Sequence, residues 1–136
     1  RRFGEGTAVL AGDALLTLAF HVISENPEGL KAANSLHSIK ILSDAAGAKG
    51  MIGGQSADTF FERRITARQA KLLDFIHAKK TGALISASVT MGGAVAGANK
   101  RKMKALKLFG DSIGLAFQII DDIFVMDKNR ITYPAV

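Results

Sequence analysis

The sequence has 136 residues, of which 48% are hydrophobic and 22% charged, and these proportions indicate one globular domain and argue against a disordered chain. It contains no Cys, which excludes disulfide bonds and thiolate metal sites. No charged-then-apolar leader is visible, so we expect a cytoplasmic protein. The net charge is +6, and part of it falls in a basic run from Lys100 to Lys107. Because no recognised nucleic-acid motif accompanies this run, we expect a solvated helix face and no nucleic-acid partner.

The first half of the chain predicts three helices. Residues 4–23 carry a broad apolar stripe at helical spacing, wide enough for the helix to be mostly buried. The segment Asn-Pro-Glu-Gly at 26–29 ends this helix, and a second one follows over about 28–46, with Pro27 suited to its first turn. The stretch 50–64 contains several glycines, and its apolar residues predict one short helix.

A capping box at Thr66 and Gln69 predicts the start of the next helix. Residues 81–99 then carry no charge, are close to the length that spans a bilayer, and place Gly93 four residues before Gly97. Gly, Ala, Ser and Thr dominate this stretch, so its transfer into a membrane would be weakly favourable. We therefore expect a buried helix packed closely against its neighbours, and no transmembrane segment.

The last predicted helix runs from Lys100 to Met126, with a break or bend near Gly110 or Gly114. Neither strand hairpins nor tandem repeats are evident in the sequence. We therefore predict an all-α fold in which residues 1–136 form a single helical domain, part of a bundle.

Two adjacent carboxylates, Asp121 and Asp122, lie within the otherwise apolar stretch 114–124. On a helix, Gln118 shares a face with both of them. In a dry core two unpaired charges would cost several kcal/mol, so something must compensate them. A hard divalent ion such as Mg²⁺ is one explanation, because it binds carboxylates and shares them with substrate phosphates. The alternative is that the pair faces solvent at a helix edge and is matched by a base such as Lys128.

A second polar position is the segment Lys-Thr-Gly-Ala-Leu-Ile at 80–85, which we expect to begin a helix. The free amides of a helix start would favour an anion, and Lys80 would add a compact charge suited to phosphate. An exposed Lys pair in front of a buried helix explains the same residues without any ligand.

Four segments together carry more information than either pattern alone. They are FGEGTAVLAGDALLTLAF at 3–20, GMIGGQSAD at 50–58, KKTGALISASV at 79–89 and GLAFQIIDDIF at 114–124. Their order and spacing resemble those of the trans-isoprenyl diphosphate synthases, the farnesyl and geranylgeranyl diphosphate synthase family. The resemblance covers nearly the whole chain. It implies an all-helical isoprenoid synthase fold around a central cavity, usually in a homodimer.

The resemblance also implies a reaction and its cofactor. Members of the family join isopentenyl diphosphate to an allylic diphosphate, and Mg²⁺ held by two Asp-rich motifs neutralises the leaving diphosphate. Asp121 and Asp122 resemble the opening pair of the second Asp-rich motif. Asp58, in a Gln-x-x-Asp segment that lines the family's cavity, is the third residue we assign to the metal.

The remaining site residues also follow from the resemblance. Lys80 resembles the family's diphosphate-binding Lys, and Gln55 of the Gln-x-x-Asp segment is expected to contact substrate. Thr81 and Gln118 match polar residues beside the developing cation. Oriented oxygen dipoles at that position can stabilise positive charge in an apolar pocket.

The sequence departs from the family pattern in three places. The first Asp-rich motif, expected upstream of FGEGTA, is absent, so we expect no catalysis by this chain alone. Val125 stands where the second motif has its third Asp. The segment RITYPAV at 130–136 resembles a family segment, but the Gly- and Lys-rich loop expected before it is nearly missing. We hypothesise that a loop of the native protein is left out between 125 and 130.

The sequence is thus compatible with three functions. The leading one is a Mg²⁺-dependent prenyltransferase of which this chain is the second-half fragment. The alternative is a catalytically incomplete homologue that acts as a regulatory or dimerising subunit. A basic helical nucleic-acid binder has only the run from Lys100 to Lys107 in its favour.

Overall fold

The computed structural model describes residues 3–25, 30–61 and 70–130, with the backbone alone at 70, 71, 73, 122 and 125–130. Every regular element within these ranges is helical, which confirms the predicted all-α fold. The elements are α1 (Glu5–Ser24), α2 (Ala32–Ala46), α3 (Met51–Phe61), α4 (Ala70–His77), the π-helical turn η2 (Ala78–Gly82), α5 (Ala83–Val95) and α6 (Lys100–Arg130).

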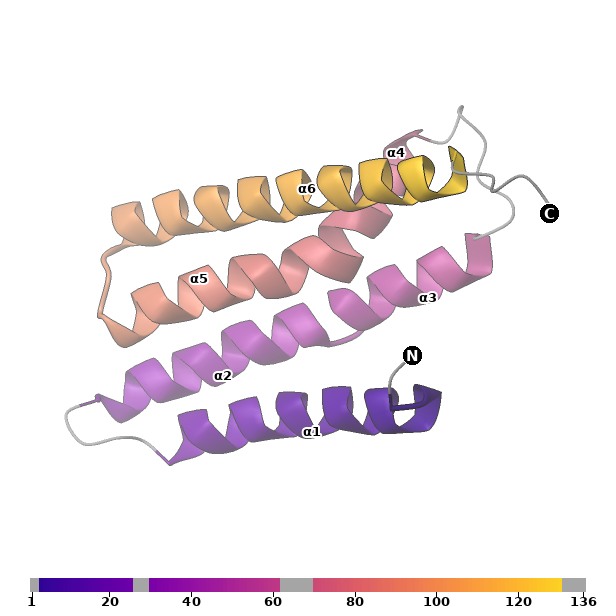
Figure 1. The fold of residues 1–136 in the computed structure, drawn as a ribbon. Coiled ribbons are helices and arrows are strands. Elements are labelled where there is room, and N and C mark those ends of the chain that lie inside the picture. The colour runs from indigo at the N-terminus through magenta and orange to yellow at the C-terminus, as the bar shows by residue number, and fades with distance from the viewer. Residues whose placement is uncertain (1–2, 26–29, 62–69, 131–136) are drawn as a thin grey trace.

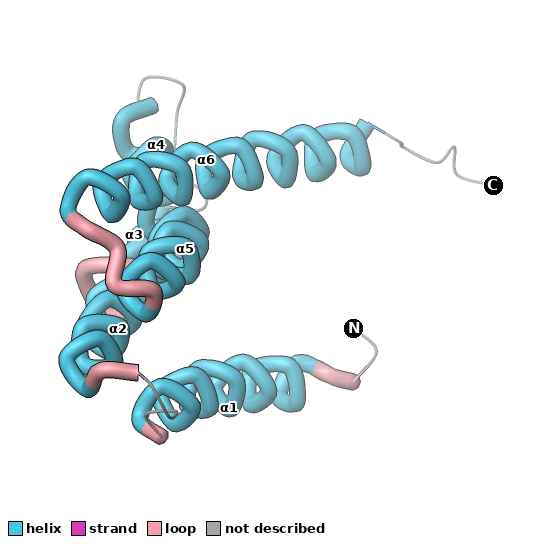
Figure 2. The backbone as a smooth tube through the Cα atoms, turned by 90° about the vertical axis from the view of Figure 1, so that its left-hand side faces the viewer, coloured by secondary structure: helices cyan, strands magenta, loops and turns pink. Residues whose placement is uncertain are grey.

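Four helices lie in a row, in which α1 packs against α2, α2 against α5, and α5 against α6 (Figure 1). The second view shows that α1 and α6 both extend to the same side of α2 and α5, one from each end of the row (Figure 2). The row therefore curves, and its concave side lies between α1 and α6.

Helix α1 is the clearest departure from prediction. Its bounds match the expected helix, but the expectation that it is mostly buried is wrong, because none of its residues is buried. The reason is that α2 is its main neighbour, so apolar side chains such as Leu10 (68% exposed) and Leu15 (67% exposed) face outward. It is also the one described helix that is long and apolar enough to cross a membrane. This is weak evidence for a span, since core helices of soluble proteins pass the same test.

Helix α5 forms the centre of the row, as its small residues predicted. Five of its thirteen residues are buried, and they are Ser86, Ala87, Thr90, Gly93 and Ala94. A Cβ added at Gly93 would lie 2.5 Å from Leu106 Cδ1 on α6, so a larger residue at this position would require the Leu106 side chain to move. The burial of these five residues agrees with the prediction of a closely packed helix.

A short turn links α5 to α6. The amides of Gly97 and Ala98 donate to the carbonyls of Ala94 (3.0 Å) and Gly93 (2.9 Å), and Gly97 has φ +65°. This is a Schellman arrangement, which requires a left-handed residue. Asn99 Oδ1 then accepts from the Lys102 amide at 3.0 Å and caps the start of α6.

Helix α6 runs unbroken from Lys100 to Arg130, so the predicted break or bend near Gly110 or Gly114 is wrong. Both glycines instead let α6 approach its neighbours. A Cβ at Gly110 would lie 2.7 Å from Ser86 Cα, and one at Gly114 would lie 2.7 Å from Gly82 Cα. The lysines at the start of α6 are exposed, as expected.

The predicted start of α2 is wrong by about one helical turn. Helix α2 begins at Ala32 rather than near residue 28, with Lys31 as an extended N-cap residue. Pro27 and the capping box of Thr66 and Gln69 lie outside the described residues. The short helix expected within 50–64 is confirmed as α3.

One ionised side chain helps to join α5 and α6. Burial raises the pKa of the Asp111 carboxyl, but hydrogen bonds from Lys107 and Ser86 and the nearby charges of Lys107 and Lys79 outweigh burial and hold its pKa below the usual value. Lys107 Nζ donates to the two carboxylate oxygens at 3.0 and 2.8 Å. The ionised form is thus the one that the fold favours.

We predict that Gly110→Ala in the whole protein lowers the free energy of unfolding by about 1–3 kcal/mol, because the new methyl meets the backbone of Ser86. The control is Gly92→Ala, where nothing lies within 4 Å and higher helix propensity favours Ala by up to about 1 kcal/mol. Urea unfolding measures both. Equal stabilities for the two variants would contradict the packing described for α5 and α6.

We predict a pH-dependent effect for Asp111→Asn. The lowered pKa of Asp111 means that its ionised form stabilises the fold above the carboxyl's unfolded pKa, near 4. That contribution is lost as the pH falls through the lower folded pKa. The variant should therefore be less stable than wild type at pH 7, and the difference should shrink below about pH 4. A difference that grows on acidification would show that the sign is wrong.

Candidate functional site

The turn η2 lies at the centre of the candidate site. It connects α4 to α5 without a break, since His77 on one side and Ala83 on the other both have φ −60° and ψ −47°. The predicted helix start at Lys80 is therefore wrong, and with it the expectation of free amides there. The wider π-type turn still gives Lys80 and Thr81 a distinct position, and such turns are frequent at functional sites.

Lys80 forms an ion pair with α3. Its Nζ donates to Asp58 Oδ2 at 2.5 Å, and the two side chains are 38% and 29% exposed. An ammonium group has three donors, so this pairing leaves donors for a further anion. The sequence analysis placed Asp58 among the metal ligands, whereas here its carboxylate contacts Lys80.

Thr81 contacts the opposite neighbour, α6. Its Oγ1 donates to Gln118 Oε1 at 2.9 Å, and Gln118 is buried, at 9% exposure. The hydroxyl proton lies between the two oxygens, so each oxygen keeps a lone pair for another group. The structure thus brings together the two residues that the sequence analysis assigned to cation stabilisation.

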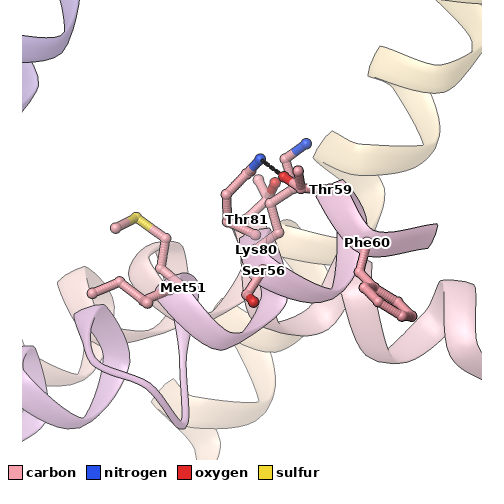
Figure 3. Close-up of a pocket in the computed structure, with 8 residues that line it drawn as sticks. Met51, Ser56, Thr59, Phe60, Lys80 and Thr81 are labelled. Atoms are coloured by element: carbon pink, nitrogen blue, oxygen red, sulfur yellow. Dashed lines mark hydrogen bonds between the residues drawn. The ribbon is translucent and has the colours of Figure 1, made fainter. Parts of the chain in front are cut away.

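A pocket of about 910 Å³ opens between α3 and η2. It is lined by Met51, Ile52, Gln55, Ser56, Thr59, Phe60, Lys80 and Thr81. In Figure 3, Met51 and Phe60 lie at opposite ends of the row of lining side chains, with Lys80 and Thr81 between them. Gln55 Nε2 donates to Thr59 Oγ1 at 3.3 Å, so this amide is oriented along the same helix (Figure 3). The pocket combines an apolar wall with a few convergent polar groups, as small-molecule sites do.

The carboxylate pair lies on α6, three and four residues after Gln118. Asp121 is exposed, and the large apolar residues around it are exposed as well, such as Ile120 (53%) and Phe124 (62%). The expected dry surroundings are therefore not formed by this chain. Among the described side chains, which do not include that of Asp122, no three acidic or imidazole groups cluster closely enough for a metal.

Five residues that line this pocket were not predicted as site residues, namely Met51, Ile52, Ser56, Thr59 and Phe60. Thr59 follows Gln55 by one helical turn, a spacing that could have indicated the hydrogen bond between them. Met51 and Ser56 had no such signal, because their place in the pocket depends on how α3 packs against η2.

The whole chain is similar to known proteins. The model of the polyprenyl synthetase family matches residues 1–130. Farnesyl diphosphate synthase of Geobacillus stearothermophilus is 38% identical over 150 aligned positions, which cover 98% of this chain and 50% of that protein. Dimethylallyltranstransferase of Fischerella ambigua is 46% identical over 121 residues, which cover 89% of this chain and 35% of that protein.

Solved structures agree with these relatives. A Zymomonas mobilis FPP/GFPP synthase superposes with a TM-score of 0.81 at 35% identity, covering 93% of this chain and 45% of that one. A Helicobacter pylori geranyltransferase complexed with magnesium and isoprenyl diphosphate superposes with a TM-score of 0.74 at 43% identity, covering 90% of this chain and 39% of that one. The chain spans 34% to 50% of the length of eight curated relatives that it matches.

We predict that Thr81→Val in the whole protein costs about 1–2 kcal/mol of stability, because it leaves a buried acceptor of Gln118 without this donor. Thr81→Ser is the matched control, since it keeps the hydroxyl and loses one methyl. Thermal unfolding of both variants measures the difference. If the Val variant were as stable as the Ser variant, the hydrogen bond would contribute nothing to the site.

Proposed function

This chain belongs to the polyprenyl synthetase family, and we propose that the whole protein is a Mg²⁺-dependent prenyltransferase. Its proposed reaction condenses isopentenyl diphosphate with an allylic diphosphate. The allylic C–O bond breaks and diphosphate leaves, a C–C bond forms to the alkene, and a proton is lost. The observation that carries the proposal is the arrangement at η2, where the successive residues Lys80 and Thr81 line one pocket and Thr81 also donates a hydrogen bond to Gln118.

Lys80 is the proposed diphosphate-binding residue. Its ammonium lies on the wall of the pocket, and its pairing with Asp58 fixes where the charge points. Gln55, on the same wall and oriented by Thr59, is the proposed second contact to substrate. A compact ammonium of this kind suits phosphate oxygens.

Thr81 and Gln118 are the proposed catalytic residues. Positive charge develops on the allylic carbon as the C–O bond breaks, and oxygen lone pairs fixed in advance stabilise such charge without reorganisation. The hydrogen bond from Thr81 to Gln118 fixes both oxygens, and the burial of Gln118 limits the access of water to its side chain.

The donor set of α6 fits magnesium. Carboxylate oxygens are the ligands this ion prefers, and the exposure of Asp121 leaves its oxygens accessible. We propose that Asp121 and Asp122 hold the ion, and we retain Asp58 as a further ligand only in a state in which Lys80 releases it. When bound, the ion would offset the negative charge of the departing diphosphate.

The chain supplies part of the site only, because it spans half or less of its relatives. The exposed apolar residues of α1 and α6 support this, since a face of that kind is normally covered. We propose that the complete protein covers them, forms a homodimer and acts in the cytoplasm. The mass of the purified protein in solution tests the dimer, and a monomer at micromolar concentration would contradict it.

One observation favours the alternative of a non-catalytic subunit, namely Val125 at the position of the third Asp. Separately, we propose that a loop belongs between 125 and 130, where the Gly- and Lys-rich segment expected before RITYPAV is nearly missing. The Geobacillus alignment is longer than this chain, so that relative has residues which the chain lacks. Peptide mass mapping across 125–130 tests the proposed loop. A regulatory subunit would show no turnover alone but would change the turnover of a mixed oligomer.

We predict that Asp121→Ala in the whole protein lowers Mg²⁺-dependent prenyl transfer by about 100-fold, because it removes a charge that holds the ion beside the leaving group. Asp111→Ala is the matched control on the same helix. Its carboxylate bonds Lys107 and does not line the α3–η2 pocket, so its turnover should stay near wild type. Radiolabelled isopentenyl diphosphate measures both. Normal turnover of the Asp121 variant would overturn the metal assignment.

A further inference from the structure

The backbone of α3 comes very close to the backbone of η2 at Gly54. A Cβ at Gly54 would lie 2.3 Å from the Lys80 amide nitrogen and 2.8 Å from the carbonyl carbon of Lys79. Both atoms belong to the backbone, so no change of rotamer could relieve the clash. Gly54 is buried, and α3 can approach this closely only because the position has no side chain.

The backbone of α6 touches η2 in the same way. A Cβ at Gly114 would lie 2.7 Å from Gly82 Cα and 3.4 Å from the Gly82 carbonyl oxygen. Both glycines of this contact are buried. The π-type turn is therefore held between two helices, each of which meets it at backbone distance.

On each helix, a polar residue four positions after the glycine also contacts η2. Four residues after Gly54, Asp58 binds the Lys80 ammonium, and four residues after Gly114, Gln118 accepts from the Thr81 hydroxyl. One turn separates residues at this spacing, so glycine and polar side chain lie on the same face of their helix. The glycine sets the distance of the helix from η2, and the polar group one turn later fixes a side chain of η2.

We propose that Gly54 and Gly114 are positioning residues, which together hold η2 in the register that presents Lys80 and Thr81 to the pocket. Each of the two glycines positions a different residue of η2. Gly54 with Asp58 positions the anion-binding Lys80, while Gly114 with Gln118 positions Thr81. The kinetic part of this inference rests on the proposed prenyl transfer, and the contact part does not.

The physical reason is the narrow range of distances over which these hydrogen bonds form. The hydrogen bond between Thr81 and Gln118 is 2.9 Å long, and a displacement of about 1 Å would break its geometry. Displacements of that size at a reacting centre can cost about 100-fold in rate. A methyl group on either glycine would push its helix away from η2, and the polar group one turn later would move with it.

The kinetic test compares two variants of the whole protein. Gly54→Ala should raise the KM for the allylic diphosphate on the order of 10-fold with kcat little changed, because Lys80 moves. Gly114→Ala should lower kcat on the order of 10-fold with KM little changed, because the Thr81–Gln118 pair opens. A general loss of packing would not raise KM alone in one variant and lower kcat alone in the other. Gly92→Ala, where nothing lies within 4 Å, should leave both unchanged.

A second measurement needs no turnover. Acetic anhydride labels lysine amines, and mass spectrometry reports the rate at each site. Gly54→Ala should speed labelling of Lys80 by about threefold, since the ion pair with Asp58 is weakened, while Gly114→Ala and Gly92→Ala should not. This result would support the contact part even if wild-type protein transferred no prenyl group, which would refute the proposed function alone.

Three outcomes would overturn the proposal. The first is wild-type KM, kcat and labelling in Gly54→Ala. The second is the same change of KM and kcat in both glycine variants. The third is failure of both variants to fold while Gly92→Ala folds, which would make the glycines general packing residues. If Gly54→Ala alone fails to fold, the double variant Gly114→Ala/Thr81→Val decides the matter. Gly114→Ala should lower kcat in the wild-type protein but should not lower it further in Thr81→Val, because residues that act through the same hydrogen bond are not additive.

Discussion

The structure depends on the backbone contact that seats η2 between α3 and α6. Glycines at the contact points let three backbones approach without intervening side chains. Short polar side chains can then reach across, so Asp58 meets Lys80 and Gln118 meets Thr81. The pocket wall follows from the same approach, because α3 and η2 supply all of its lining residues. The packing of η2, its two polar pairs and the pocket wall therefore all depend on these glycine contacts.

Periodicity predicted the helices well, because burial of one face repeats at helical spacing wherever a helix packs. It could not predict η2, since a π-type turn changes hydrogen bonding without changing which residues are apolar. It also misjudged α1, whose apolar stripe is real but whose neighbours here are few. Gly110 and Gly114 suggested a bend because local propensity alone was considered, whereas their role is contact with another helix.

The candidate site was predicted in part. The pairing of Thr81 with Gln118 agrees with the roles that the family resemblance implies. The pairing of Asp58 with Lys80 was not foreseen, because it joins residues 22 apart in sequence and depends on how α3 crosses η2. The surroundings of Asp121 also could not be read from its apolar neighbours, since those side chains point outward in this chain. The proposal that the complete protein covers this face would account for both the open face and the exposed carboxylate.

The most direct measurement is a crystal structure of the whole protein with Mg²⁺ and an unreactive allylic diphosphate analogue. We expect the diphosphate to contact Lys80, the prenyl chain to begin beside Thr81 and Gln118, and the metal to contact Asp121. Diphosphate bound elsewhere, with Lys80 touching only Asp58 and no metal on α6, would contradict this expectation.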